Sequence, residues 1–286
     1  MLFVPFGADF QKIVSSHGTT RPAASFGAVV TPGASNVYGS YATILTGANN
    51  TDDSYGILIN ANSNAVTTAA RDTIMTIGLD AAGGTTFTTF IADLLVSCAG
   101  PYVAGKGCGI WYFFPVFIKA GSTIGAKASV NNATAGTLAC NVRLLCQPRH
   151  PDAVRVGSFV DTFGIETSTS SGTAVTAGTT SEGAWTQLGS NATKAYWFWQ
   201  LGFGMNNTVM GGVSLHGDLA IGDGTNLKIA IQDELCATST AEELSTHKTS
   251  PDREAIAASG DGVYGRLQCS GASSTGRSMA AYGVGG

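Results

Sequence analysis

The stretch that decides the fold is Asn36-Val37-Tyr38-Gly39-Ser40-Tyr41-Ala42-Thr43-Ile44-Leu45, because its pattern returns as Thr180-Ser181-Glu182-Gly183-Ala184-Trp185-Thr186-Gln187-Leu188-Gly189. At this offset of 144 residues, Gly39 matches Gly183 and Tyr41 matches Trp185. The offset also matches the following later residues: Tyr55 with Trp199, Ile57 with Leu201, Ile59 with Phe203, and Ile77-Gly78 with Ile221-Gly222. A pattern that returns in the same order is the sequence signature of a repeat.

The match continues toward the end of each copy with a slightly smaller offset. At 140 residues Ile91-Ala92-Asp93-Leu94-Leu95 meets Ile231-Gln232-Asp233-Glu234-Leu235, and at 139 Ile124-Gly125-Ala126-Lys127 meets Val263-Tyr264-Gly265-Arg266. We therefore predict a tandem duplication. The expected parts are an N-terminal arm (1–30), a first β-sandwich (31–150), a linker or loop (151–180) and a related second β-sandwich (181–286).

Both copies consist of short segments rich in β-branched and aromatic residues, separated by runs of Gly, Asn and Ala. The expected strands are 40–45, 55–59, 73–79, 88–96, 110–118, 123–130, 138–147, 185–188, 196–203, 217–221, 227–235, 263–269 and 277–282. Short helices are expected only at Asp9 to Val14 and Ser239 to Thr246. The expected fold class is all-β, with two tandem jelly-roll-like β-sandwich domains and an N-terminal arm.

Composition favours a protein surrounded by copies of itself or by partners. Charged residues make up 12% of the 286 residues, against about 25% in a typical domain, so few charges protect strand edges from pairing. The net charge is −4 without a basic block, which argues against nucleic-acid binding. No apolar run reaches the ~20 residues of a membrane helix, and Met1 to Gly7 lacks the features of a signal peptide.

The candidate chemistry is sparse. The six cysteines form no CxxC pair, so we expect buried free thiols in a protein made in a reducing cytoplasm. The four histidines lie far apart in the sequence, and we expect neither a metal site nor a cofactor. Neighbouring acids such as Asp233 and Glu234 point to opposite faces of a strand and cannot act as an acid–base pair. The sequence therefore predicts that the chain is not an enzyme.

One calcium candidate remains. Asp218 and Asp223 could supply oxygen ligands to Ca²⁺. The Asp-Gly dipeptide at Asp223 is also a strong hairpin-turn signal, and we favour the turn.

Aromatic side chains are the main candidates for contacts. In the runs Trp111-Tyr112-Phe113-Phe114 and Tyr196-Trp197-Phe198-Trp199, alternate rings face opposite sides of a strand, so both faces need cover. The cover could be the second domain, a loop, a neighbouring subunit or a sugar. The predicted interface anchors are Phe3, Phe6, Phe10, Trp111, Tyr112, Trp185, Trp197 and Trp199.

The order of these motifs resembles a loose group of virion proteins encoded by tailed bacteriophages. In this group a Gly-x-aromatic strand precedes a segment like Tyr112-Phe113-Phe114-Pro115-Val116-Phe117-Ile118-Lys119-Ala120-Gly121-Ser122-Thr123-Ile124. The second copy departs from the pattern, because it has no proline before Ile256 and has Ser259-Gly260 in place of Ala120-Gly121. The motifs are structural, and the resemblance implies a component of the particle without implying an activity.

We therefore expect a non-enzymatic structural component of a tailed-phage virion, made in the host cytoplasm. It would act as a tail, fibre or baseplate adaptor or as a capsid decoration protein, through contacts with its own copies and with other virion proteins. The alternative is a carbohydrate-binding adhesin or receptor-binding protein that recognises a host surface glycan through Trp111, Trp197 or Trp199 beside acids such as Asp218.

Overall fold

The computed structural model describes residues 10–16, 27–63, 73–96, 110–131, 137–150, 154–190, 194–204, 214–237, 260–270 and 277–286. Within these ranges every regular element is a β-strand, and the strands form antiparallel sheets of the β-sandwich, jelly-roll type. The expected all-β fold class is confirmed. The described residues include no helix that is long and apolar enough to cross a membrane.

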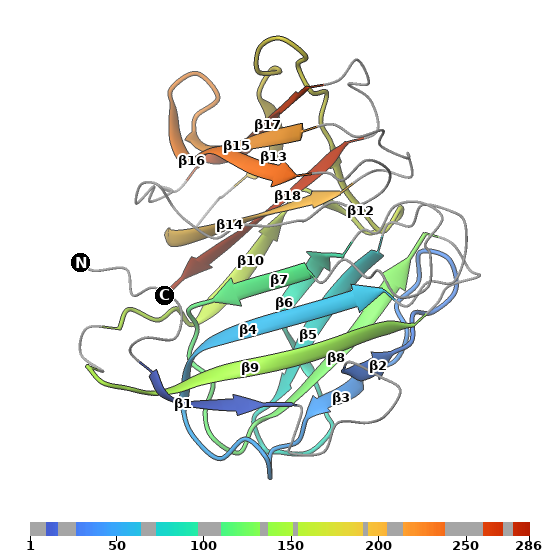
Figure 1. Cartoon of the computed structure of the whole chain (residues 1–286), viewed down its shortest axis with the longest axis vertical. Helices are drawn as coiled ribbons and strands as arrows, with labels where there is room; N and C mark the ends of the chain where they lie inside the picture. Colours follow the sequence, from blue (N-terminus) through green and yellow to red (C-terminus); the bar gives the residue numbers. More distant parts are fainter. Residues whose placement is uncertain are drawn as a thin grey trace.

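The first unit packs two sheets face to face (Figure 1). The front sheet has the order β1 (Phe10–Ser15), β9 (Leu138–Pro148), β4 (Ser54–Ser63) and β7 (Ile110–Phe114), with β2 (Ala28–Val30) also paired to β9. The rear sheet has the order β3 (Ala42–Leu45), β8 (Thr123–Val130), β5 (Thr73–Asp80) and β6 (Thr88–Leu95).

The second unit has a middle sheet and an outer sheet. In the middle sheet β18 (Ser278–Gly285) pairs with β10 (Phe159–Phe163), β12 (Ser171–Ala174) and β14 (Tyr196–Gly204), and β11 (Ile165–Glu166) pairs with β12. The outer sheet has the order β13 (Thr186–Ser190), β17 (Gly262–Cys269), β15 (Ser214–Gly222) and β16 (Leu227–Ala237).

The two units share one topology. The order β3-β8-β5-β6 in the first unit corresponds to β13-β17-β15-β16 in the second, and the central strand β9, with its partners β1, β2 and β4, corresponds to β18 with β10, β12 and β14. A bulge is also repeated: Asp93 and Asp233 have φ angles of 57° and 52° where β6 and β16 depart from regular pairing. Such bulges bend a strand at a defined place, so the two units share a detail as well as an order.

Strand pairing corrects one match made from the sequence. Ile77 lies opposite Ala126, and Leu219 lies opposite Gly265. Because Ala126 and Gly265 are matched residues of the repeat, Ile77 corresponds to Leu219 rather than to Ile221. Alternating strands tolerate a shift of two residues without exchanging their faces, which is why the sequence pattern could not exclude it.

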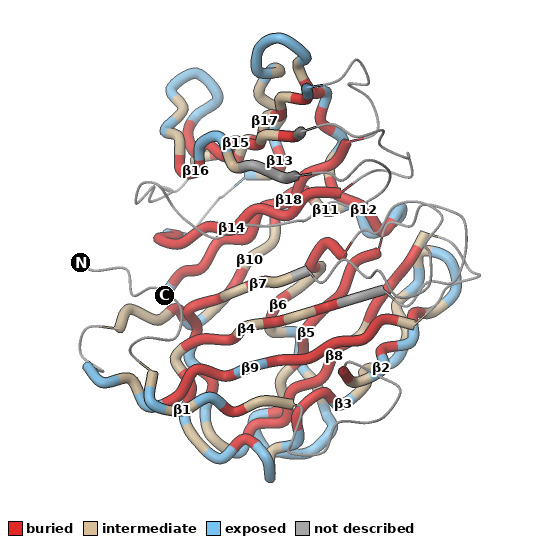
Figure 2. Tube along the Cα trace, viewed as in Figure 1, coloured by how far each residue is buried: buried red, intermediate tan, exposed pale blue. Residues whose placement is uncertain are grey.

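One apolar core runs through the contact between the units. Figure 2 shows buried chain along β14, whereas in β7 buried residues alternate with intermediate ones, where the units meet. The core cluster of the first unit includes Tyr112 and Phe114 of β7 together with Trp197, Phe198 and Tyr282 of the second unit. The ring of Tyr282 packs edge-on against Tyr112, with centroids 5.3 Å apart. The units are therefore packed together through aromatic side chains.

Residues 151–180 are not a linker in the part that the structure describes. Residues 159–163 form β10 along β18, and Val160 and Phe163 are buried. Burial of these apolar side chains in the sheet stabilises β10 as part of the second unit.

The described part of the arm packs on its own unit. The segment expected to start a helix at Asp9 is instead β1, whose residues pair with β9 from Phe10↔Pro148 to Ser15↔Arg143. Its burial alternates, with Val14 in the core and Ile13 exposed, which is strand periodicity. The other predicted helix, Ser239 to Thr246, lies outside the described residues.

Three cysteines have described side chains: Cys140, Cys146 and Cys269 are buried and form no disulfide with a described residue. Burial raises the pKa of the Cys140 thiol to about 12. Burial also raises the pKa of Cys146 to about 11, with a further contribution from the Asp52 carboxylate. The raised pKa values of Cys140 and Cys146 disfavour their thiolate forms, which are the nucleophilic ones.

Candidate functional site

The outward side of the front sheet carries apolar side chains among polar ones such as Asn60 and Arg143. Ile59 and Ile57 point into the core, so the alternate residues Leu58 on β4 and Phe113 on β7, which lie opposite each other, point outward. Ile13 and Val29 point the same way and are 52% and 47% exposed. We call this surface the front face and define it by Ile13, Val29, Leu58, Trp111 and Phe113. A one-sided antiparallel sheet normally alternates apolar-in with polar-out.

Packing holds the rings of the front face in place. A Cβ atom on Gly56 would lie 2.8 Å from the ring of Phe113, so this glycine makes room for the ring on the sheet. The guanidinium of Arg143 lies 5.0 Å from the centroid of the Trp111 ring. Cation–π contacts of this kind hold a ring flat against its neighbour, and the front face is therefore a fixed surface.

The predicted anchors separate into three groups. Tyr112, Trp197 and Trp199 are buried at 0%, 7% and 0% exposure and contact this chain's own residues. Trp111 and Trp185 are half-buried, and so is Phe10 at the start of β1. Phe3 and Phe6 lie outside the described residues. Neither ring face of Trp197 or Trp199 is open to solvent. These two rings therefore cannot stack on a sugar in this structure.

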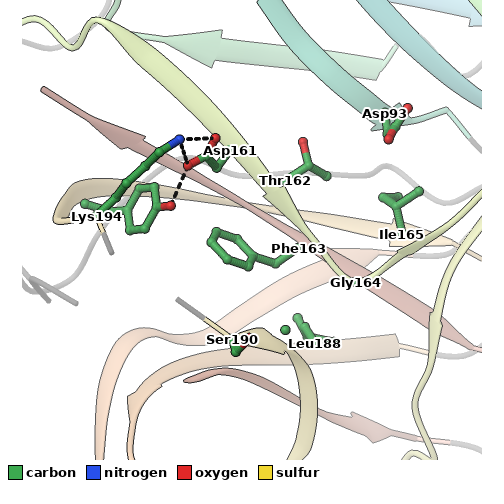
Figure 3. Close-up of a pocket in the computed structure, with 11 residues that line it drawn as sticks. Asp93, Asp161, Thr162, Phe163, Gly164, Ile165, Leu188, Ser190 and Lys194 are labelled. Atoms are coloured by element: carbon green, nitrogen blue, oxygen red, sulfur yellow. Dashed lines mark hydrogen bonds and ion pairs between the residues drawn. The ribbon is translucent and has the colours of Figure 1, made fainter. Parts of the chain in front are cut away.

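A pocket of about 480 Å³ lies between the units (Figure 3). Asp93 enters it from β6 of the first unit, and the other walls come from β10, β13 and the start of β14. Its lining residues are Asp93, Asp161, Thr162, Phe163, Gly164, Ile165, Leu188, Gly189, Ser190, Lys194 and Tyr196. The hydroxyl of Thr162 donates a hydrogen bond of 2.6 Å to the carbonyl oxygen of Ala92, which ties β10 to β6 beside the pocket.

Asp161 organises one side of this interdomain pocket. Its carboxylate accepts hydrogen bonds of 2.7 and 3.0 Å from the Lys194 ammonium and one of 2.5 Å from the Tyr196 hydroxyl, as Figure 3 shows. Burial and the Asp161 carboxylate raise the pKa of Tyr196, which keeps its hydroxyl protonated. The Phe163 ring packs edge-on against Tyr196 and tilted against Trp199, at centroid distances of 5.5 and 5.7 Å.

Asp93 organises the opposite side. Its Oδ1 accepts hydrogen bonds from the Tyr38 hydroxyl and, at 3.2 Å, from the Thr76 hydroxyl, and its backbone N–H donates to Thr76. Burial and the Asp93 carboxylate raise the pKa of Tyr38. Sequence reasoning did not single out Asp93, Asp161 or Lys194. The only available signal was Asp93, which matches Asp233 in the repeat.

A second polar cluster lies on the outer sheet at the position that corresponds to Tyr38, Thr76 and Asp93. It contains Glu182, Asp218 and Asp233, whose carboxylate oxygens lie within 4.8 Å of one another. Arg266 contacts Glu182 at 2.5 Å and Asp218 at 2.7 Å and therefore supplies positive charge inside the cluster. Loss of solvent, together with Asp218 and Asp233, raises the pKa of Glu182 against the opposing effect of Arg266.

The repeat also keeps a cation over an aromatic ring beside each cluster. Lys127 lies 4.9 Å from the centroid of Tyr41 in the first unit, and Arg266 lies 4.3 Å from the centroid of Trp185 in the second. These are the matched positions of the repeat. The corresponding positions of the two units therefore have similar geometry, with hydroxyls of Tyr38 and Thr76 in the first unit and carboxylates of Glu182 and Asp218 in the second.

The two calcium candidates are in different surroundings. Asp218 is buried in the ion pair with Arg266, and its Oδ1 accepts a hydrogen bond of 2.6 Å from the backbone N–H of Asp233. Asp223 lies in the β15–β16 hairpin turn, where it accepts hydrogen bonds from the backbone N–H groups of Thr225 and Asn226 at 2.8 and 2.6 Å. Asp223 therefore stabilises the turn and does not join Asp218 in a ligand set.

Comparisons with known proteins give distant neighbours. No family model matches the chain, and no curated protein matches it. Two solved structures of peptide N-glycanases, one named N-glycanase F and one named peptide-N(4)-(N-acetyl-β-D-glucosaminyl) asparagine amidase, are each 8% identical and each cover 96% of this chain, with TM-scores of 0.35 and 0.36. The alignments include 95% and 96% of the lengths of these two structures.

A third solved structure is a tandem of CBM22 domains from Paenibacillus barcinonensis Xyn10C. It is 12% identical, covers 93% of this chain and is itself covered over 98%, with a TM-score of 0.24.

The two amidase structures overturn the expectation that the chain is not an enzyme, because they align with nearly its whole length. That expectation is withdrawn. The TM-scores assign no reaction and no catalytic residue to this chain.

Proposed function

We propose that this chain is a structural component of a tailed-phage particle, made in the host cytoplasm and assembled through its front face. The particle assignment rests on the resemblance carried by the Gly39-x-Tyr41 strand and the segment from Tyr112 to Ile124. The assembly assignment rests on one observation: the front sheet carries apolar side chains on both sides, with Ile13 and Val29 about half exposed on the outward side.

The front face fits a protein partner better than solvent. Its five defining side chains are aliphatic or aromatic. The rings of Trp111 and Phe113 are half-buried on β7, and the exposed Ile13 and Val29 lie on β1 and β2, beyond β4 and β9 in the same sheet. Aromatic side chains next to an arginine, here Arg143, are enriched at the centres of protein interfaces. The partners would be other copies of this chain, or other particle proteins in a tail, fibre, baseplate or capsid-decoration position.

The test is the mass of the chain in solution over a range of concentrations. We expect a defined oligomer for the native sequence and a monomer for the Ile13→Asp/Val29→Asp variant, because two buried carboxylates would lack partners in the contact. Val37→Asp is the matched control, since Val37 is 55% exposed and lies in a turn away from the front sheet. Equal masses for both variants would contradict assembly through this face.

Point substitutions test the role of the front face more specifically than removal of residues 1–30 would. Deletion would take away β1 and β2 and leave backbone groups of β9 without partners. The particle assignment has a separate test: mass spectrometry of purified phage particles should detect the chain in a fixed ratio to the other particle proteins. Its absence from particles that form normally would exclude a structural role.

A further inference from the structure

We propose that the interdomain pocket binds a neutral saccharide of one or two rings. This inference is independent of the proposed function, because the pocket shares no residue with the front face. Its volume of about 480 Å³ is within the range of small-molecule sites, which is about 300–1,000 Å³. The class of ligand follows from the groups that line it.

The polar groups of the pocket match hydroxyl groups. Asp161 offers carboxylate lone pairs, Lys194 offers ammonium protons, and the Ser190 hydroxyl can do either. The second oxygen of Asp93, Oδ2, receives no hydrogen bond from any described residue, since both side-chain donors bond to Oδ1. A sugar hydroxyl donates and accepts at the same time, so a ring with several hydroxyls can satisfy this mixed set.

A small apolar part of the wall can contact the C–H face of a sugar ring, because Ile165 is half-buried whereas Phe163 and Leu188 are 8% and 7% exposed. Phe163, Ile165 and Leu188 form part of the wall, and Figure 3 shows them near Thr162 and Ser190. The Phe163 ring is held by Tyr196 and Trp199 and does not need to be ordered when a ligand enters. A wall that is already fixed reduces the entropy lost on binding.

The charges select a neutral ligand. The pocket contains the carboxylates of Asp93 and Asp161 and the single ammonium of Lys194, so its net charge is −1. An anionic group placed there would meet one excess negative charge and would break the Asp161–Lys194 pair if it took the ammonium for itself. Phosphates and sugar acids are therefore disfavoured, whereas neutral hydroxyls are not.

The contact between the units also shapes the site. Asp93 belongs to β6, while Asp161 belongs to β10, so neither unit alone contains both carboxylates. The hydrogen bond from Thr162 to Ala92 and the aromatic core keep these strands together. The duplication has thereby created a site at the junction that a single unit does not possess.

The experiment is a calorimetric or ligand-observed NMR titration of the full chain with methyl glycosides of glucose, galactose, mannose and N-acetylglucosamine, and with maltose and cellobiose. We expect saturable binding of at least one of these probes. We expect Asp161→Asn and Lys194→Met to weaken it at least tenfold. Lys194 is 45% exposed at the rim, so its substitution leaves the fold intact.

The matched control is Asp52→Asn, because Asp52 also accepts hydrogen bonds from a lysine and a hydroxyl, those of Lys12 and Thr51, but lies outside the pocket. It should bind the probes as the native chain does. Glucuronate should bind at least tenfold more weakly than glucose. Absence of saturable binding to every probe, binding that survives both pocket substitutions, or tighter binding of glucuronate would overturn the proposal.

Discussion

The hydroxyl oxygen of Tyr282 accepts a hydrogen bond of 2.7 Å from the backbone N–H of Leu95, across the contact between the two units. The Tyr112 hydroxyl donates to the carbonyl oxygen of the same Leu95 at 2.6 Å. The backbone N–H and carbonyl oxygen of Leu95 on β6 are therefore each hydrogen-bonded to a tyrosine, one from each unit. Both rings are fully buried, which makes this contact part of the core.

Tyr282→Phe should destabilise the chain by about 1–3 kcal/mol, because it leaves the buried Leu95 N–H without a partner. Urea denaturation followed by circular dichroism measures the effect. Tyr55→Phe is the control, since Tyr55 is half-buried and no described residue bonds to its hydroxyl. We also expect one cooperative transition, since the core cluster of the first unit includes Trp197, Phe198 and Tyr282 of the second. Two separate transitions, only one of them shifted by the substitution, would contradict a shared core.

Asp218→Ala should destabilise the chain by about 3 kcal/mol, because it leaves the guanidinium of Arg266 and the backbone N–H of Asp233 without this buried carboxylate. Asp223→Ala removes an exposed carboxylate from a turn and should cost clearly less than the Asp218 substitution. The same denaturation assay compares them. Equal costs would show that the Asp218–Arg266 pair contributes no more than a surface contact.

Cys140 should resist alkylation in the folded protein. With a pKa raised to about 12 by burial, its thiolate is scarce at pH 8 and its sulfur is covered. Iodoacetamide labelling followed by peptide mass spectrometry should find Cys140 unmodified in buffer and modified in 6 M guanidinium. Rapid labelling of Cys140 in buffer would place its sulfur at the surface and contradict the packing of β9.

Acrylamide should quench the tryptophan fluorescence of the native chain only in part. Trp197 and Trp199 are buried, whereas Trp111 and Trp185 are half-buried. The Trp111→Phe/Trp185→Phe variant should therefore lose most of the quenchable emission. If quenching persists unchanged in this variant, Trp197 or Trp199 is accessible, and the sugar-stacking hypothesis for these rings regains support.

The sequence by itself determined the strands and the repeat. Alternating apolar residues, Gly-rich breaks and the matched Gly39 and Gly183 predicted short strands in two related copies, because side-chain periodicity and turn residues are local properties of the chain. It also predicted that the aromatic runs need cover on both faces. Local patterns did not reveal that residues 159–163 form a strand, since their partner, β18, is more than 100 residues away.

Only the tertiary structure decided what covers the rings and where a ligand could bind. Trp197 is buried in the cluster that joins the two units and Trp199 in the core of the second unit, so these two predicted anchors contact the chain itself. Asp93 and Asp161 are 68 residues apart in the sequence and line one pocket because β6 packs against β10. Such a pairing depends on how two folded units dock, and no spacing along the chain records it.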